Sequence, residues 1–430
     1  MKEIARLALS VLLILVESTT AQENAIGSTT SSQELINRSQ SNLQQLHILF
    51  RHGDRAPVRR MFDNSTPIEL LWPIGIGQLT NLGVKQEFNL GRWFREQYNS
   101  FVPEKYNASD IYVRSTDTDR SLMSGQAFLA GLYRCTDPKH CPLVPAGIFW
   151  RPVPIHTVPL TADVEFRSPN CPRLYNLTQE RANSKEIETL LQNHQELINL
   201  LKRVSNYQKI TADAILTITD ILVCFKSNSI PLPSWCTDEI FRELRQIQYF
   251  VWKTEFLSSD EILQLEVGVF LKEMADGLVA ATQRKAPFGE TEVKRLMVYS
   301  VHDTNIDYVL ASFGYTGGIM MDYASALIFE VLGPRPPSNV EKYHLRMRFK
   351  KGWRDDVANY IQILPCVTEP AEQGCQLDRV VQFLRAWSLT KEEYAMRCKL
   401  GSDSLRRSGV SLRVLLSTVM LLSHYYLSSF

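Results

Sequence analysis

The stretch RHGDRAP, residues 51–57, directly follows an apolar run from Leu43 to Phe50. The run predicts a buried strand, which places the charged residues at its carboxyl end. Arginine offers a planar set of N–H donors that matches phosphate oxygens in pairs, and it stays charged at any working pH. A histidine beside it can act as a nucleophile or carry a proton, and a glycine lets the backbone come close to a ligand. The stretch therefore predicts a phosphate site built from Arg51, His52 and Arg55.

Two later segments repeat this arrangement. Residues 111–113 predict a short strand that ends at Arg114, before a helix. Residues 295–300 predict another strand, and His302 and Asp303 follow it at the start of a helix. Ligands of open α/β sheets bind at the carboxyl ends of the strands, where helix N-termini also favour anions. We therefore expect the polar residues of the three strand ends to meet in one crevice.

The middle of the chain has a different pattern. Helical periodicity with few strand signals over residues 164–286 predicts a helical cap domain, inserted into an α/β catalytic domain. That catalytic domain is expected to combine residues 43–163 with 287–400. The helices expected in the insertion cover residues 186–204, 211–224, 238–255 and 260–285. Two later strands, 323–332 and 341–350, are expected to form an antiparallel hairpin at the sheet edge.

The motifs resemble those of a known family. RHGDRAP matches the R-H-G-x-R-x-P pattern of the histidine acid phosphatases, and residues 114–120 resemble the family's second arginine motif. Residues 232–235 resemble its prostatic and lysosomal branch, and the similarity extends from Leu43 to Lys399. The resemblance implies an α/β fold with an open mixed sheet and helices on both faces, as in phosphoglycerate mutase, plus an inserted helical cap domain.

The resemblance also implies a role for each site residue. His52 is the expected nucleophile, which becomes a phosphohistidine, and Asp303 is the expected acid that protonates the leaving alcohol. The residues expected to hold the phosphate are Arg51, Arg55, Arg114 and His302. The chemistry needs no metal or other cofactor, because the arginines neutralise the charged transition state. A neutral His52 and a protonated Asp303 coexist only below neutrality, so the expected optimum is on the order of pH 4 to 6.

Two further polar residues near the motifs are assigned scaffold roles. Arg120 lies within the helix that follows Arg114, and we expect it to form a structural ion pair with Asp117 or a neighbouring acid. His156 lies in a proline-rich run, where a lone histidine is more often structural than catalytic, so it stays outside the catalytic set.

Composition limits the partners. The 430-residue chain contains 47 Lys and Arg against 46 Asp and Glu, a net charge of +1, so no overall basic field attracts nucleic acid. The expected partners are small phosphate monoesters, and the family resemblance also allows a homodimer.

Both ends of the chain resemble targeting segments. Residues 1–21 predict a secretory signal peptide, because a short apolar run follows basic residues. Residues 401–430 combine small residues, a polar spacer and an apolar end from Val414 to Phe430, which is the layout of a GPI-attachment signal. A marginal transmembrane tail and a packed terminal helix are the alternatives. The protein is therefore expected in the secretory pathway, at the cell surface or outside the cell, with the lysosome as the alternative.

Eight cysteines suit four disulfide bonds in an oxidising compartment. The resemblance implies a long-range bridge between Cys171 and Cys398. The family's partner of Cys224 falls at Ala326, so we expect Cys224 to pair with Cys236 instead. The remaining expected pairs are Cys135 with Cys141 and Cys366 with Cys375, and the glycosylation sequons are Asn37, Asn64, Asn107 and Asn176.

Three alternatives to a broad phosphomonoesterase stay open. A metal-dependent phosphohydrolase could use His302 and Asp303 as metal ligands, but the other spaced histidines and aspartates of that class are missing. A non-catalytic surface binding protein could use the same fold. A phytase or inositol polyphosphate phosphatase of the same family would need extra basic residues, which Arg59 and Arg60 could supply.

Overall fold

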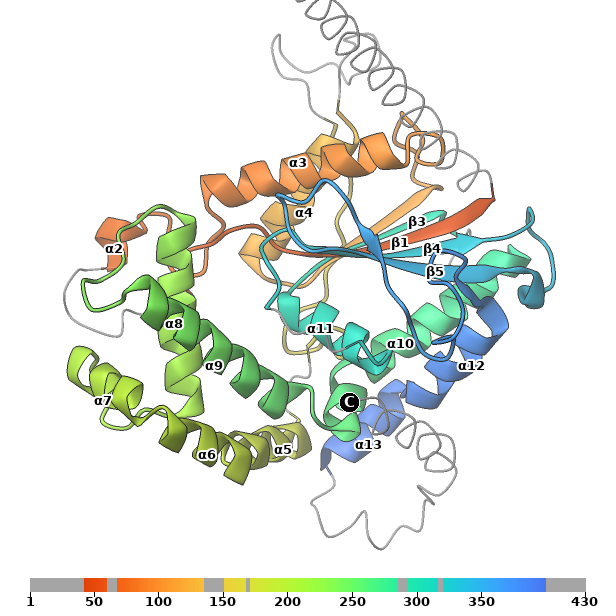
Figure 1. Ribbon diagram of the computed structural model, residues 1–430. Helices are drawn as coiled ribbons and strands as arrows, with labels where there is room; N and C mark the ends of the chain where they lie inside the picture. The colour runs from red at the N-terminus through yellow and green to blue at the C-terminus, as the bar shows by residue number, and fades with distance from the viewer. Residues whose placement is uncertain are drawn as a thin grey trace, which may run out of the picture.

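The computed structural model describes residues 42–59, 68–134, 151–167, 171–284, 293–315 and 320–399. Its centre is a mixed sheet of seven strands (Figure 1). The strands run in the order β2 (Ile111–Ser115), β3 (Leu296–Val301), β1 (Leu43–Arg51), β4 (Ala326–Leu332), β5 (His344–Lys350) and β6 (Asn359–Tyr360), and β7 (Cys375–Gln376) also pairs with β5. The first three are parallel to one another and the rest are antiparallel.

Strand β1 lies in the middle of this sheet and is buried on both faces. Leu46, Ile48 and Phe50 point into one apolar core, whereas Leu49 points into the other. This alternation follows from the two-residue period of a strand. Because β1 is covered on both sides, its apolar residues continue without a break from Ile48 to Phe50, while the polar Gln45 and His47 are also buried. The first arginine, Arg51, comes at its carboxyl end.

Helices cover both faces of the sheet. Helices α3 (Asn81–Gln97) and α4 (Asp119–Leu132) form one layer, and α10 (Asp260–Gln283), α11 (Asp303–Ser312) and α12 (Leu377–Trp387) form the other (Figure 1). Thr80 caps α3 as its side chain accepts a hydrogen bond from the Gly83 N–H. The expected fold class, an open mixed sheet with helices on both faces, is confirmed.

Five helices form a separate body beside the sheet: α5 (Pro172–Ala182), α6 (Lys185–Asn193), α7 (Gln195–Val204), α8 (Ala212–Ser227) and α9 (Asp238–Phe256) (Figure 1). Helices α6 to α9 share an apolar core that Trp72, next to the short helix α2 (Ile68–Leu71), also joins. The single helix expected over residues 186–204 is divided at His194, which ends α6 and precedes α7.

Helix α10 belongs to a different layer from the rest of the expected insertion. Its residues Val267, Phe270 and Met274 lie in the core beneath the sheet, together with residues of α11 and α12. The boundary expected at residue 286 places α10 in the same insertion as α5 to α9, whereas in the structure α10 packs against the sheet. Helical periodicity shows that a segment is a helix, but it does not show which core the helix joins.

The expected hairpin forms, but its place in the sheet differs. Strands β4 and β5 pair antiparallel in full register, and a short 3₁₀ helix, η1 (Val340–Lys342), precedes β5. Strand β4 also pairs with β1, and β5 pairs with β6 and β7, so the hairpin lies inside the sheet rather than at its edge. The two-residue strands β6 and β7 are too short for a periodic pattern.

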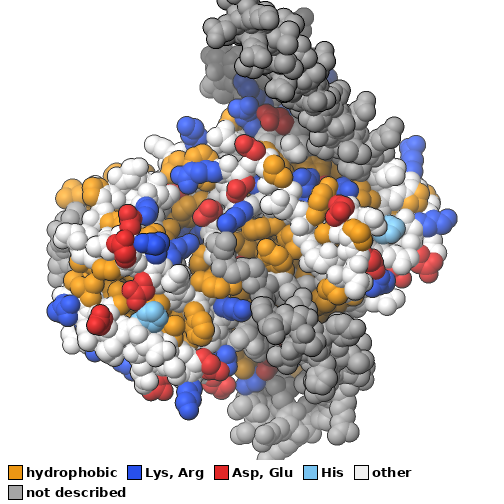
Figure 2. All heavy atoms as spheres, in the orientation of Figure 1, with side chains coloured by type: hydrophobic (Ala, Val, Ile, Leu, Met, Phe, Trp, Pro, Cys, Tyr) orange, Lys and Arg blue, Asp and Glu red, His pale blue; other side chains and the backbone are white. Residues whose placement is uncertain are grey.

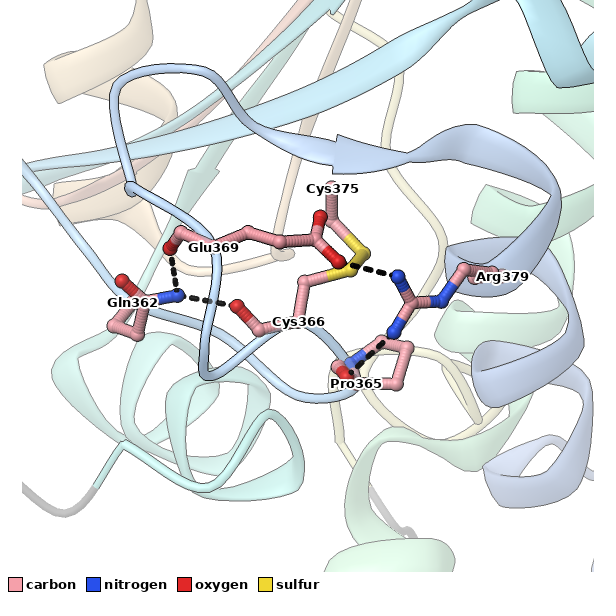
Figure 3. The surroundings of a disulfide bond; sticks show 6 residues. All are labelled: Gln362, Pro365, Cys366, Glu369, Cys375 and Arg379. Atoms are coloured by element: carbon pink, nitrogen blue, oxygen red, sulfur yellow. Dashed lines mark hydrogen bonds and ion pairs between the residues drawn. A yellow bond between two sulfur atoms is a disulfide. The ribbon is translucent and has the colours of Figure 1, made fainter.

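Two expected disulfide bonds are present. Cys171–Cys398 joins the start of α5 to α13 (Lys391–Lys399), and Cys366–Cys375 closes a loop beside β5 (Figure 3). Glu369 approaches the second bridge, but it forms an ion pair of 2.5 Å with Arg379. Both sulfurs of this group are already bonded, so it offers no thiolate to a metal.

The expected bridge between Cys224 and Cys236 is wrong, because both residues are free, buried thiols in the structure. The Cys224 Sγ lies 3.5 Å from the Tyr323 hydroxyl and 3.6 Å from the Arg55 guanidinium, so it faces the strand ends. The expected Cys135–Cys141 pair lies outside the described residues.

The surface agrees with the balanced charge. On the face shown in Figure 2, basic, acidic and apolar side chains are interspersed. Asn107 and Asn176 are exposed, as glycosylation requires, whereas Asn37 and Asn64 lie outside the described residues. Among the described helices, none combines the length and apolar character needed to cross a bilayer.

Candidate active site

The carboxyl ends of the three parallel strands meet at one edge of the sheet. Arg51 is opposite Val301, and Ser115 is opposite Ser300. The chain continues this pairing just beyond the strands, because the His52 N–H donates to the Val301 carbonyl at 3.0 Å. The convergence expected from the sequence is therefore present for the segments around residues 51, 115 and 301.

The loop that carries the motif is held by backbone contact. A Cβ at Gly53 would lie 2.4 Å from the carbonyl oxygen of Gly83, so the glycine serves the close approach of α3 rather than that of a ligand. The buried Asp54 carboxylate accepts hydrogen bonds from Thr80 at 2.6 Å and from Asn228, at the end of α8, at 2.7 Å. The loop is thus fixed to both α3 and the helical body.

His52 is held as a neutral ring with a defined tautomer. Its Nδ1 lies 2.8 Å from the Gly53 carbonyl oxygen, and since a carbonyl can only accept, Nδ1 carries the proton. The Nε2 atom then keeps its lone pair. Burial lowers the pKa of His52 well below its usual value, and the charges of Arg120, His302, Arg51 and Arg55 lower it further. An unprotonated nitrogen is what a nucleophile needs.

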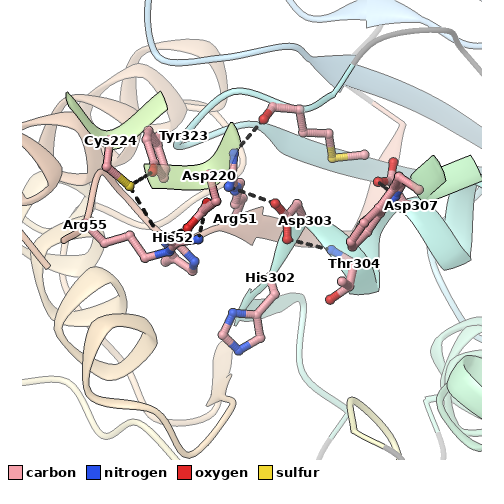
Figure 4. Close-up of polar contacts among 12 residues, drawn as sticks. Arg51, His52, Arg55, Asp220, Cys224, His302, Asp303, Thr304, Asp307 and Tyr323 are labelled. Atoms are coloured by element: carbon pink, nitrogen blue, oxygen red, sulfur yellow. Dashed lines mark hydrogen bonds and ion pairs between the residues drawn. The ribbon is translucent and has the colours of Figure 1, made fainter. Parts of the chain in front are cut away.

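Arg51 links the motif to Asp303 (Figure 4). The two side chains form an ion pair of 2.7 Å, and the guanidinium also donates to the Met321 carbonyl and lies 4.4 Å from the ring centre of Tyr323. Burial alone would raise the pKa of Asp303, but the charges of Arg51 and Arg55 outweigh it and lower the pKa. Its other oxygen accepts from the Thr304 N–H at 2.9 Å, at the start of α11.

Arg55 is bound by an acid of the helical body. Its guanidinium makes two hydrogen bonds, of 3.1 and 3.0 Å, to the two carboxylate oxygens of Asp220 on α8 (Figure 4). Such a two-point pair has the geometry with which a guanidinium also binds two phosphate oxygens. Asp220 was not identified from the sequence, because its partner lies 165 residues away.

His302 lies beside His52. Their ring centres are 5.4 Å apart with the planes nearly perpendicular, and the His302 Nε2 lies 3.0 Å from the Thr116 hydroxyl. Burial and the charge of Arg120 lower the pKa of His302 to about 3, although Asp303 opposes the shift. The ring is therefore neutral through the acidic range, with one nitrogen that donates a hydrogen bond and one that accepts.

Arg114 reaches the same sheet edge, but its side chain points to other partners. It pairs with Asp163 at 2.6 Å and with Glu165, and it lies 4.9 Å from the ring centre of Phe166. In the part of the chain that the structure describes, no contact joins Arg114 to His52 or Asp303. Its expected role in phosphate binding stays a prediction.

Arg120 acts on the site residues through its charge. The expected ion pair with Asp117 does not form, and its positive charge acts on His52, His302 and Asp303. The buried Nε of Arg120 has no hydrogen-bond partner among the described residues. Burial and the charges of Arg55 and Arg51 lower the pKa of Arg120 to about 10, so it remains a cation. The spacing of the motif does not predict that Arg120 influences the site, because the direction of its side chain depends on how α4 packs.

A second carboxyl group, Asp307, lies one helical turn after Asp303. It accepts a hydrogen bond of 3.0 Å from the Trp252 indole N–H of α9 (Figure 4). Burial, with the negative charge of Asp303, raises the pKa of Asp307 to about 7. Asp307 thus keeps a proton in acid and adds no second negative charge beside Asp303.

A cavity of about 250 Å³ opens beside Arg51, Arg55 and Asp303, whereas His52 and His302 are not among its lining residues. Arg51, Arg55 and Asp303 line it from the sheet side, and residues of α8 and α9 line it from the helical body. The arrangement can bind an anion beside a neutral histidine and a carboxyl group that is able to carry a proton.

Comparison with known proteins places the chain in a family. The model of the histidine phosphatase superfamily (branch 2) matches residues 42–350. Lysosomal acid phosphatase of Rattus norvegicus is 30% identical over 370 residues, which cover 84% of this chain and 82% of that protein. Prostatic acid phosphatase of Homo sapiens is 32% identical over 312 residues, covering 70% and 77%. The chain belongs to the histidine phosphatase superfamily, branch 2.

Solved structures show the same fold. The phytase of Hafnia alvei in complex with myo-inositol hexakis sulphate covers 84% of this chain and 99% of its own, with a TM-score of 0.62 at 17% identity. The expected family is therefore confirmed by sequence, and the expected sheet and helix architecture is confirmed by structure.

Proposed function

We propose that this protein is an acid phosphatase that hydrolyses phosphate monoesters through a phosphohistidine at His52. The observation that carries the proposal is the His52 tautomer, with Nδ1–H bound to the Gly53 carbonyl and Nε2 left as an electron-pair donor. Arg51 and Arg55, on either side of it in the motif, supply the charge that binds phosphate. The relatives named acid phosphatase support this activity.

When the substrate binds, its phosphate replaces the carboxylates that pair with Arg51 and Arg55. Phosphate oxygens compete with Asp303 for Arg51 and with Asp220 for Arg55, because carboxylate and phosphate present similar pairs of acceptors. The exchange frees Asp303, and the negative charge of the phosphate raises its pKa so that it takes up a proton.

Two displacements complete the reaction. In the first, the His52 Nε2 bonds to phosphorus, the ester P–O bond breaks, and the leaving oxygen takes the proton of Asp303. In the second, water attacks phosphorus and gives a proton to the Asp303 carboxylate, the N–P bond breaks, and phosphate leaves. His52 and the protonated Asp303 are restored, and the arginines stabilise the charge at phosphorus in both steps without a metal.

The helical body has a part in this proposal. We assign α5 to α9 the role of a cap, since α8 and α9 supply the outer wall of the cavity and Asp220 holds Arg55. A broad phosphomonoesterase remains our proposal for the substrate range.

A substrate panel tests the proposed activity. We expect hydrolysis of p-nitrophenyl phosphate and of several alkyl phosphates at about pH 5, with no loss of rate in a chelator such as EDTA. Phosphate release from inositol hexakisphosphate serves as the comparison. Activity that needs an added divalent cation would contradict the mechanism, and turnover confined to inositol hexakisphosphate would replace the broad range with a phytase.

We also propose that residues 1–21 direct the chain into the secretory pathway and that residues 401–430 direct GPI attachment. Both segments lie outside the described residues. The expressed protein should be membrane-bound and released by a phosphatidylinositol-specific phospholipase, and deletion of Val414–Phe430 should give soluble, active enzyme. Retention on membranes after the phospholipase would favour the spanning tail.

A further inference from the structure

The outer wall of the cavity carries a cation that the proposed mechanism does not use. Arg245, Gln248 and Trp252 are spaced along one face of α9, and all three line the cavity opposite the motif. The Arg245 guanidinium donates to the Gln248 side-chain oxygen at 2.7 Å, and Gln248 is itself buried. This contact orients the guanidinium without neutralising it.

Arg245 differs from the other arginines of the cavity in its partners. Arg51 pairs with Asp303, Arg55 with Asp220, and the exposed Arg59 with Asp213. Within the described ranges, Arg245 forms no ion pair with a carboxylate. Asp322, which also lines the cavity, and Asp220 act on it only at longer range.

The charge of Arg245 is also poorly screened. Burial lowers its pKa, and the positive charge of Arg51 lowers it further. Two guanidinium groups that face one cavity and repel each other are stabilised when an anion lies between them. In the proposed mechanism the transferred phosphate binds Arg51 and Arg55, which leaves Arg245 for an acidic group elsewhere on the ligand.

We propose that Arg245 and Gln248 form a second anion subsite, which binds an acidic group on the alcohol portion of the phosphate monoester. The inference rests on the proposed phosphatase activity and specifies its substrate class: phosphate esters of small alcohols that carry a carboxylate or a second phosphate. At roughly 30 Å³ for each water-sized group, a cavity of about 250 Å³ takes more than a phosphoryl group alone.

Matched ester pairs test the subsite. Glycerol 3-phosphate and 3-phosphoglycerate share the same scissile group and differ in a hydroxymethyl against a carboxylate. Propane-1,3-diol monophosphate and bisphosphate differ in a second phosphate. We expect the wild-type kcat/KM to favour the more anionic member of at least one pair. Arg245→Met should reduce that preference by about tenfold to a hundredfold, the range for a hydrogen bond to a charged group, and Arg245→Lys should restore part of it.

Arg242→Met is the matched control, because Arg242 lies one turn earlier on α9 and pairs with Glu239 in solvent. It should leave the preference unchanged. The two pairs distinguish a carboxylate from a phosphate as the preferred group. A wild-type enzyme without any preference, or an equal loss on both members of each pair in Arg245→Met, would overturn the subsite.

Binding separates this inference from the proposed reaction. Calorimetry on His52→Ala, with and without Arg245→Met, measures the Kd ratio of 3-phosphoglycerate to glycerol 3-phosphate, and that of the propanediol pair, without turnover. We expect Arg245→Met to reduce the preference for the anionic ligand by the same factor. If the wild type hydrolyses no ester while the Kd ratio still depends on Arg245, the reaction is wrong and the subsite stands. If hydrolysis proceeds and neither Kd ratio depends on Arg245, the subsite is wrong and the reaction stands.

Discussion

Replacing His52 with alanine is expected to lower kcat for p-nitrophenyl phosphate on the order of 10⁵-fold, as removal of a nucleophile does in other enzymes with covalent intermediates. The reason is that the Nδ1–H bond to the Gly53 carbonyl fixes the ring and leaves the Nε2 lone pair free, while the charges of Arg51 and Arg55 help to keep the ring neutral. The measurement is the initial rate under saturating substrate, with circular dichroism to show that the variant is folded.

His156→Ala is the matched control. His156 is exposed, stacks on Tyr112 at 5.1 Å between ring centres, and has no contact with the cavity. It should keep its rate within about twofold, as surface substitutions away from a site usually have small effects. A folded His52→Ala protein with full turnover would remove the phosphohistidine mechanism.

Replacing Asp303 with asparagine is expected to slow alkyl phosphates about 10²-fold to 10⁴-fold, the usual contribution of a general acid. The same change should slow p-nitrophenyl phosphate much less, because a phenolate departs without a proton. Asparagine keeps the size of the side chain and an oxygen for the Thr304 N–H, so the start of α11 is preserved. The ratio of kcat/KM for the two esters is the measurement, and equal losses on both would show that Asp303 is not the acid.

The pH profile follows from the same two residues. The pKa of His52 is lowered well below 6.5, so its ring stays neutral into the acidic range, and the rate falls only when a lower pH protonates it. The rate falls at higher pH as Asp303 loses the proton that it must donate. The ion pair with Arg51 lowers the pKa of Asp303, and bound phosphate raises it again. We expect a bell-shaped profile with an optimum on the order of pH 4 to 6, and Asp303→Asn should lose the upper limb with alkyl esters. A wild-type optimum above neutrality would contradict this assignment.

The sequence predicts the strand ends well because their signals are local. The buried strands are mostly apolar, so the charged or titratable residues that directly follow Phe50, Val113 and Val301 mark the edge where ligands bind. The start of α3 is local in the same way, since the Thr80 side chain caps the helix by accepting from the Gly83 N–H within one turn. These features need no information about distant parts of the chain.

The features that the sequence does not predict depend on packing between distant segments. Asp220 and Arg245 enter the site because α8 and α9 lie over the sheet edge, and no spacing within their helices indicates that. The charge of Arg120 acts on His52, and among the described residues Arg120 forms no ion pair with Asp117. The Cys224 thiol lies 3.5 Å from the Tyr323 hydroxyl and is not bonded to Cys236. Nearness in sequence favoured both wrong pairings, whereas the packed structure decides which way each side chain points.

Trapping the covalent intermediate tests the central claim most directly. The enzyme is mixed with ³²P-labelled p-nitrophenyl phosphate, quenched in alkali, in which a phosphohistidine survives, and digested for mass spectrometry. The mechanism predicts one labelled phosphoryl group on a nitrogen of His52, in the peptide that contains residues 51–57, and its loss on acid treatment. A label on any other residue, or turnover at full rate with no labelled His52, would contradict the mechanism.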